Sequence, residues 1–227
     1  MIAFGPTEEQ EVAREAMREF AQGAMRPSAR PCDEEGRVPD EFLEQAWQLG
    51  LTSTQIPEAY GGGGEPRSPL TNALVLEELA HGDAALALAA LAPSLFAMPV
   101  VEFGTDAQKR ELLPLFCGER YHAASLALVE PGPCFDPVGL RTVAERKGDG
   151  WVLSGAKCFV PMPARASHFL VLARAGEGVG LDAVQAFVVP RDAAGLSISE
   201  PEKKMGLRAL PTAALSFERV ELPASAR

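Results

Sequence analysis

The chain has 227 residues and 47% of them are hydrophobic, which is enough to bury the core of one large domain or two ordinary ones. Acidic residues outnumber basic ones by 31 to 21, so the formal net charge is -10. This balance makes nucleic acid a poor partner, because tracking a phosphate backbone needs a basic surface.

Cysteine spacing and the start of the chain predict a cytoplasmic protein. Residues 1–5 run into a charged helix without the basic-then-apolar pattern of an export signal. No C-x-x-C pair occurs and no histidine stands beside a cysteine at ligand spacing, so we expect reduced thiols and no metal site. The four cysteines are Cys32, Cys117, Cys134 and Cys158.

The first half of the chain predicts helices joined by Gly/Pro turns. Residues 7–10 read Thr-Glu-Glu-Gln, the form of a capping box, and apolar residues then recur on one face as far as Phe20. A second helix is predicted from Asp40, as its cap, to Gly50, in the left-handed position that ends a helix. After a glycine-rich loop, a third helix is expected over residues 70–80.

An uncharged, alanine-rich stretch follows. Residues 84–101 carry no charge over 18 positions, which is near the length of a membrane span. Two prolines interrupt the stretch, so we interpret it as buried helices with a break near Pro93 and expect no membrane partner. A capping box at Thr105 predicts one more helix, and the helical half is expected to end near Gly118.

The second half of the chain predicts β-structure in short runs separated by turn residues. The clearest hairpin pairs residues 142–146 with 151–154, because the Asp-Gly between them supplies the positive φ that a tight turn needs. Further strands are expected at residues 157–160, 168–174, 186–189, 196–199 and 215–220. The sequence therefore predicts the α+β class, with an all-helical domain over residues 1–121 followed by an antiparallel β-barrel or sandwich domain over residues 122–227.

Residues with catalytic chemistry do not cluster in the sequence, so no catalytic residue is predicted. His81, His122 and His168 are isolated, and nothing places two of them together near a nucleophile. Glu77 and Glu78 point about 100° apart on a helix, so we expect a solvated face or a cap partner rather than paired acids.

A series of short motifs spans nearly the whole chain, and its order is more specific than any one member. The series includes Leu49-Gly50-Leu51, Ile56-Pro57-Glu58-Ala59-Tyr60-Gly61-Gly62, Glu77-Glu78-Leu79-Ala80, Gly104-Thr105-Asp106-Ala107-Gln108-Lys109, Glu130-Pro131-Gly132, Gly150-Trp151-Val152-Leu153-Ser154-Gly155-Ala156-Lys157, Phe187-Val188-Val189-Pro190 and Lys204-Met205-Gly206-Leu207-Arg208. In this order the motifs resemble the acyl-CoA dehydrogenase family.

The resemblance implies a flavin-dependent enzyme. In that family a helical domain and a middle β-domain are followed by a C-terminal four-helix domain, and FAD lies between the last two. A glutamate of the C-terminal domain removes the α-proton of an acyl-CoA thioester while the β-hydrogen leaves as hydride to the flavin. Only four residues follow Pro223, so the chain is expected to stop before that domain and to show no turnover alone. The partners implied are an acyl-CoA-type thioester, a polypeptide or homologous subunit supplying the C-terminal domain, and electron-transfer flavoprotein as acceptor.

The resemblance also places the flavin ring against two strand segments. Backbone contacts at Leu126 and Leu128 tolerate any side chain. Val129 and Pro161 stand where the family usually has threonines, which removes two hydroxyls and, at the proline, the backbone N–H. Phe159 replaces a tryptophan and keeps the ring without its N–H.

On the pyrophosphate side, the family's Gly-Ser-Asp reads Cys134-Phe135-Asp136. A glycine there lets the backbone approach the phosphates closely, and Phe135 puts a ring where a small hydroxyl would sit. Three hypotheses therefore stay open. The first is an FAD-dependent dehydrogenase that needs a C-terminal helical half, and the second is a structural or regulatory subunit that keeps the fold without FAD. The third is a stand-alone ligand-binding module, which predicts a folded monomer with no exposed apolar face.

Overall fold

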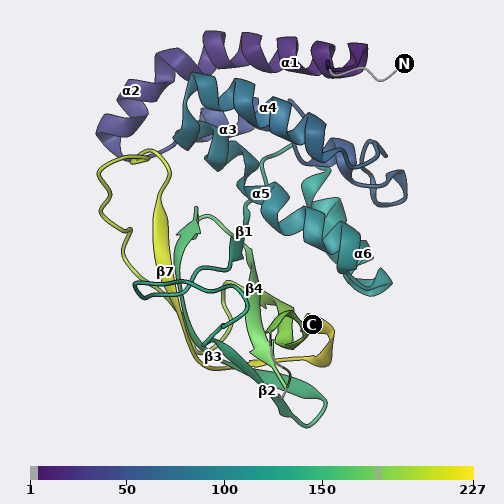
Figure 1. Cartoon of the computed structure of the whole chain (residues 1–227), viewed down its shortest axis with the longest axis vertical. Helices are drawn as coiled ribbons and strands as arrows, with labels where there is room; N and C mark the ends of the chain where they lie inside the picture. The colour runs from purple at the N-terminus through teal and green to yellow at the C-terminus, as the bar shows by residue number, and fades with distance from the viewer. Residues whose placement is uncertain (1–4, 177, 179) are drawn as a thin grey trace.

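The computed structural model describes residues 5–176, 178 and 180–227. Helices form one end of the molecule and a curled sheet forms the other, so the chain passes once from a helical part to a β part (Figure 1). The α+β class predicted from the sequence is confirmed. The helices are α1 (Glu8–Phe20), α2 (Arg26–Glu35), α3 (Asp40–Trp47), α4 (Pro69–Gly82), α5 (Ala84–Phe103) and α6 (Asp106–Leu112).

Both predicted capping boxes form. The hydroxyl of Thr7 accepts the backbone N–H of Gln10 while the Gln10 side chain accepts the N–H of Thr7, and Thr105 and Gln108 repeat the exchange at α6. The second cap is wrong by one residue, because Asp40 is the first residue of α3 and Pro39 precedes it in extended conformation. Asp40 thus contributes its charge to the first turn of the helix rather than a side-chain cap.

Helix α5 is continuous, and the predicted break near Pro93 is wrong. Pro93 lacks the N–H that would bond the carbonyl of Ala89, four residues earlier. The hydroxyl of Tyr121 donates to that carbonyl at 3.4 Å, so a side chain from the next part of the chain supplies the missing partner. Pro93 itself is buried, and packing against the surrounding core holds the helix together through both prolines.

Among the described residues, α5 is the one helix long and apolar enough to cross a membrane by length and composition. Core helices of soluble proteins pass the same test. Here Leu86 and Ala89 pack in the core of the helical part, and Phe96 and Val100 pack with Leu170 of the sheet. Helix α5 is therefore the element that joins the two parts.

The sheet has seven strands. Six of them follow the order β1-β4-β2-β3-β7-β6, and β5 pairs with β4 off this path. It is mixed rather than wholly antiparallel, because β4 runs parallel to both β1 and β2. The strands are β1 (Ala124–Ala127), β2 (Val143–Lys147), β3 (Gly150–Pro161), β4 (His168–Ala175), β5 (Val184–Pro190), β6 (Leu196–Ile198) and β7 (Thr212–Leu222).

The predicted hairpin forms, with Lys147 opposite Gly150. Its turn differs from the prediction, because the positive φ falls on Gly148, at 58°, and Gly150 is already the first residue of β3. The strands expected at 151–154 and 157–160 are one strand, β3, whose pairing with β7 shifts register between Leu153 and Gly155. Gly155 has φ +142°, and a Cβ there would lie 2.6 Å from the Cα of Thr142. Glycine therefore permits a bulge that bends β3 without ending it.

Candidate functional site

The two segments expected to face a flavin lie side by side. The N–H of Cys158 donates to the carbonyl of Val129 at 2.8 Å, and the hydroxyl of Ser125 donates to the carbonyl of Pro161. Strand β1 ends the sheet path, so its outer edge carries backbone groups outside the sheet pairing. The end of β3 and the segment following β1 thus form one continuous surface.

A buried ion pair fixes that surface from behind. Lys157 is fully buried, and its Nζ donates to Glu130 Oε1 at 2.9 Å and to the carbonyl of Leu128 at 3.1 Å. The Glu130 carboxylate also accepts the N–H groups of Arg141, at 2.7 Å, and Thr142, at 2.8 Å. Sequence reasoning missed this pair, although a lysine inside an otherwise apolar strand was a signal that a buried carboxylate must lie nearby.

The environment of the ion pair lowers the pKa of both Glu130 and Lys157. Burial pushes the pKa of Glu130 up, but hydrogen bonds from Thr142, Arg141 and Lys157 outweigh it and lower the pKa to about 2. Burial lowers the pKa of Lys157, and the neighbouring Glu130 carboxylate counteracts part of that effect. The Glu130 carboxylate is therefore ionised at neutral pH. It accepts hydrogen bonds from Lys157 on β3 and from the N–H groups of Arg141 and Thr142 before β2.

Phe159 and Pro161 present less to a cofactor than the resemblance implies. Phe159 has φ 53°, a left-handed conformation uncommon outside glycine, and its side chain is 57% exposed. Its N–H donates to Glu202 Oε1 at 3.1 Å, so this donor is already used. Pro161 has no N–H, and its carbonyl is occupied by Ser125.

The loop after Glu130 carries the other predicted site residues. Cys134 is exposed and Phe135 is half-buried. Asp136 accepts the N–H of Val138 at 3.0 Å through Oδ1 and the N–H of Gly139 at 3.1 Å through its carbonyl, so it shapes the loop. The structure therefore assigns Asp136 a turn-forming role within the chain.

An apolar groove of about 360 Å³ opens beside this surface, between α4 and α5. Most of its lining side chains are aliphatic residues of the two helices, Leu126 of β1 also lines it, and Gln55, Arg67, Asn72 and Ser94 add polar groups. The sequence signal was the spacing of apolar residues along α5, which was interpreted only as core. The groove is lined by Leu51, Gln55, Arg67, Asn72, Val75, Leu76, Leu88, Leu91, Ser94, Leu95, Met98, Pro99 and Leu126.

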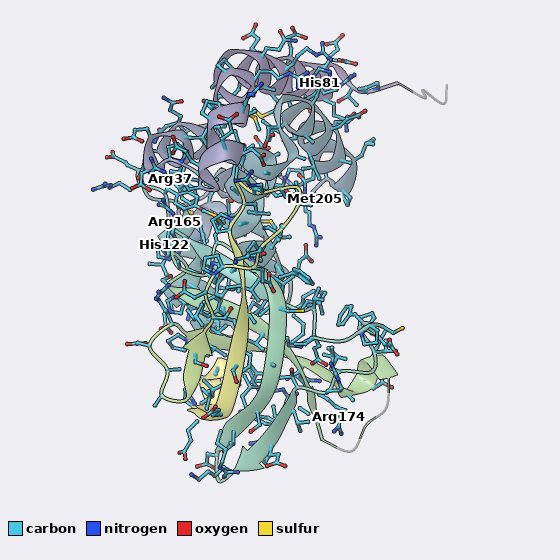
Figure 2. The ribbon with its side chains drawn as sticks, turned by 90° about the vertical axis from the view of Figure 1, so that its left-hand side faces the viewer. Arg37, His81, His122, Arg165, Arg174 and Met205 are labelled. Carbon is cyan, nitrogen blue, oxygen red and sulfur yellow. The ribbon has the colours of Figure 1, made fainter. Side chains whose placement is uncertain are left out.

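Two of the histidines do meet at a serine, contrary to the sequence analysis. Ser167 Oγ lies 2.9 Å from His122 Nε2 and 3.0 Å from His168 Nδ1. Parallel pairing sets Ala124 of β1 opposite His168 of β4, which brings residues 122 and 168 together across 46 positions of sequence. Burial lowers the pKa of both histidines, and His81 lies apart on α4. Figure 2 shows His122 where the helical part meets the sheet.

Glu78 also differs from its prediction. It is buried on α4, where Oε1 accepts Arg14 Nη2 at 3.0 Å and Arg18 Nη2 at 2.7 Å from α1. The hydrogen bond from Arg18 lowers the pKa of Glu78. Within the part of the chain that the structure describes, no group of histidine, cysteine and acidic side chains is placed to hold a metal ion.

Helices packed on a curled mixed sheet, with an apolar groove that leads to the end of β1, define the first two domains of an acyl-thioester dehydrogenase fold. Residues 7–120 match the acyl-CoA dehydrogenase N-terminal domain, and residues 125–220 match the acyl-CoA dehydrogenase middle domain. The chain belongs to the acyl-CoA dehydrogenase family.

Individual relatives agree. The chain is 34% identical over 225 residues to a probable medium-chain specific mitochondrial acyl-CoA dehydrogenase of Caenorhabditis briggsae, covering 98% of this chain and 54% of the relative. It resembles a glutaryl-CoA dehydrogenase of Mycobacterium smegmatis solved in complex with FADH2, with TM-score 0.84, 27% identity, and coverage of 97% and 55%. A chain from a structure of the electron transferring flavoprotein of Acidaminococcus fermentans matches with TM-score 0.86, 28% identity, and coverage of 99% and 59%. The chain thus spans a little over half the length of these relatives.

The fit of FAD to this site is incomplete. The two strand segments that the resemblance assigns to the flavin ring are paired, as the Cys158–Val129 hydrogen bond shows. The side-chain donors are missing, because Val129 has no hydroxyl and Pro161 has neither hydroxyl nor N–H. The paired backbone of the two segments is present, but the side-chain hydrogen-bond donors to a flavin at Val129 and Pro161 are absent.

Proposed function

We propose that this chain forms the helical and β portion of a flavin-dependent acyl-CoA dehydrogenase, and that the groove between α4 and α5 receives the acyl part of an acyl-CoA thioester. The observation that carries the proposal is the groove itself, about 360 Å³ and lined mostly by aliphatic side chains, Leu126 among them. Such a surface favours an alkyl chain, since burying each CH₂ contributes about 0.8 kcal/mol.

The groove needs a second wall. Leu76, Leu88 and Leu95 border it and remain 38%, 37% and 46% exposed. Leu76 belongs to α4, and Leu88 and Leu95 belong to α5. A group of exposed leucines on two neighbouring helices is the usual mark of a surface that packs against another element. We therefore propose that a helical half, from a separate polypeptide or from further sequence, covers α4 and α5 and brings the base for α-proton removal.

In this proposal, residues of the chain position the strand segments at the flavin and shield the acyl chain from water, and they do not transfer protons. Lys157 and Glu130 hold the segment after β1 against the end of β3. Leu126 and the α5 leucines keep water away from the acyl chain. The segments at Val129 and Phe159 would hold the ring of FAD, which would supply the hydride-acceptor chemistry at that place. Electron-transfer flavoprotein is the electron acceptor that we propose, in keeping with the likeness to the Acidaminococcus fermentans chain.

A second candidate function is a structural or regulatory subunit without FAD. Pro161 and Phe135 favour it, because the first removes a donor at the ring and the second places a bulky side chain in the phosphate-side loop. The two candidates share the fold and differ in the cofactor.

A visible absorption spectrum separates them. The protein is purified from its native host with whatever copurifies, and then mixed with added FAD. The dehydrogenase proposal expects flavin bands that remain after gel filtration, together with a helical partner. A protein that stays colourless with its partner present and FAD added would exclude it and favour the subunit.

A further inference from the structure

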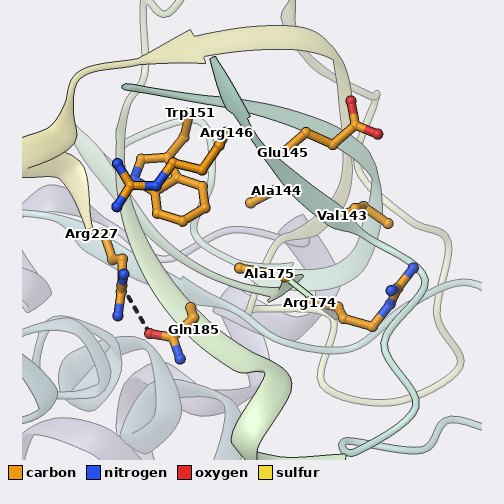
Figure 3. Close-up of a pocket in the computed structure, with 10 residues that line it drawn as sticks. Val143, Ala144, Glu145, Arg146, Trp151, Arg174, Ala175, Gln185 and Arg227 are labelled. Atoms are coloured by element: carbon orange, nitrogen blue, oxygen red, sulfur yellow. Dashed lines mark hydrogen bonds between the residues drawn. The ribbon is translucent and has the colours of Figure 1, made fainter. Parts of the chain in front are cut away.

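A second cavity, of about 600 Å³, lies in the sheet part of the molecule. Arg227, at its border, also contacts helix α6, because its carbonyl accepts Gln108 Nε2 at 3.1 Å. Strands β2, β3, β4 and β5 border it together with Arg227, as Figure 3 shows. Its volume falls in the range of small-molecule sites, about 300–1,000 Å³. The lining residues are Val143, Ala144, Glu145, Arg146, Trp151, Arg174, Ala175, Gly176, Gln185 and Arg227.

Two guanidinium groups share one aromatic ring in this cavity. Arg146 lies over the ring of Trp151 with Cζ 4.6 Å from the centroid, and Arg227 lies 5.6 Å from the same centroid. Trp151 is buried, so its ring is a fixed platform. Each contact is an attractive cation–π interaction, so one ring is in contact with two positive charges.

The polar contacts of these two arginines are with neutral groups. Arg146 Nη1 faces the carbonyl of Asp149 at 3.5 Å, and Arg227 Nε donates to Gln185 Oε1 at 3.0 Å. Over residues 5–176, 178 and 180–227, neither arginine forms an ion pair. Most of the N–H donors of the two guanidinium groups therefore stay available for a ligand.

The rest of the cavity adds an apolar floor. Val143, Ala144 and Ala175 line the side away from the arginine pair, and Figure 3 shows Glu145 and Arg174 directed outward from there. Glu145, the one acidic side chain among the described lining residues, therefore lies on the opposite side from Arg146 and Arg227. A ligand with an anionic end and a less polar body would match both halves of the cavity.

We propose that this cavity binds a phosphate-bearing anion, with its phosphate between Arg146 and Arg227 and its body against Trp151 and the sheet floor. Planar guanidinium groups donate two parallel N–H bonds to a phosphate, which makes arginine the preferred partner for that group. The whole chain carries a net charge of -10, so attraction must come from the local pair rather than from the overall field.

The site is separate from the segments assigned to the flavin ring. Trp151 and Phe159 both belong to β3 and lie eight positions apart, on the order of 25 Å along an extended strand. Its success or failure is therefore independent of flavin binding.

The test is a titration of the full chain followed through Trp151 fluorescence. The only other tryptophan, Trp47, is replaced by Phe so that the signal reports this cavity alone. The probes are ADP, inorganic pyrophosphate and adenosine. We expect saturable changes with ADP, with a Kd tighter than about 1 mM, and none with adenosine. Saturation by pyrophosphate as well would identify inorganic phosphate compounds as sufficient ligands.

Matched variants identify the residues. Arg146→Ala and Arg227→Ala should each weaken ADP binding by about tenfold, and Arg146→Lys should recover only part of it because lysine cannot donate in a planar pair. Arg26→Ala, an exposed arginine of α2, is the control with the same charge change and should bind normally. Thermal unfolding of wild type with and without ADP gives a readout that does not depend on substitution. Adenosine binding as well as ADP, equal binding by Arg146→Ala, or no saturable effect in either readout would overturn the proposal.

Discussion

Lys157 and Glu130 form an ion pair with an Nζ–Oε1 distance of 2.9 Å and side-chain exposures of 0% and 5%. The pair joins β3 to the segment that follows β1. Removing one member of a buried ion pair leaves the other charge without compensation, which typically costs 3–5 kcal/mol.

We expect Lys157→Met to lower the free energy of unfolding by about 3–5 kcal/mol, measured by urea denaturation. The double variant Lys157→Met/Glu130→Leu should recover part of that loss, since it leaves no unpaired charge. Lys147→Met is the control, because Lys147 pairs with Glu221 at the surface and both are more than half exposed. A Lys157→Met protein as stable as this control would show that the buried pair is not a structural requirement.

Stability should fall in acid through Glu130. Its pKa is lowered from the ordinary 4.5 to about 2, so the folded state binds this proton less readily than the unfolded chain. The contribution is fully present above pH 4.5 and is lost as the pH falls toward 2. Urea midpoints of wild type and Glu130→Gln should therefore converge over that window. A gap that stays constant down to pH 2 would contradict the assignment.

Glu78 should stabilise the contact between α1 and α4. Glu78→Gln weakens the hydrogen bonds to Arg14 and Arg18, and we expect a loss of about 1–2 kcal/mol, limited by the partial exposure of the arginines. Glu77→Gln is the matched control on the same helix, since Glu77 is exposed. Differential scanning calorimetry of the two variants at pH 7 makes the comparison, and equal melting temperatures would refute it.

Restoring the donors at the flavin segment should strengthen FAD binding. Each new hydrogen bond contributes about 1 kcal/mol, so Val129→Thr with Pro161→Thr should lower the Kd for FAD at least tenfold in a fluorescence titration. Val138→Thr makes the same chemical change in the exposed loop and should leave the Kd unchanged. An unchanged Kd in the double variant would mean that these two positions do not limit flavin binding.

The groove predicts a chain-length effect. In the complete assembly, octanoyl-CoA should bind more tightly than CoA by isothermal titration calorimetry, because the alkyl chain is removed from water. Leu95→Asp should abolish that difference, while Leu115→Asp, an equally accessible leucine outside the groove, should keep it. Similar losses in both variants would point to a general effect of added charge.

Local chemistry made much of the fold predictable. The capping boxes at Thr7 and Thr105 satisfy backbone groups within four residues, so their patterns are readable in the sequence. The same holds for the β2–β3 hairpin, whose turn residues set its register. These features depend on neighbours in the chain, and they formed as predicted except for the position of the positive φ in the hairpin turn.

The failures came from contacts between distant residues. Proline at position 93 predicts a helix break unless some other group satisfies the Ala89 carbonyl, and Tyr121 does so from 32 residues away. His122 and His168 meet because β1 and β4 pair in parallel. A pattern of short strands and turn residues predicts the strands but does not show which strands pair. Glu78 is paired by arginines that lie 60 and 64 positions earlier.

Tyr121 stands where the helical part ends and the sheet begins. Its N–H donates to Glu44 Oε2 at 3.0 Å, its ring meets Trp47 edge-on at 5.5 Å, and its hydroxyl reaches α5. A residue held at three points leaves little freedom for the segment around it. These contacts tie the segment between the two parts to α3 and α5. We therefore expect the groove between α4 and α5 and the end of β1 to keep their relative positions when a ligand enters.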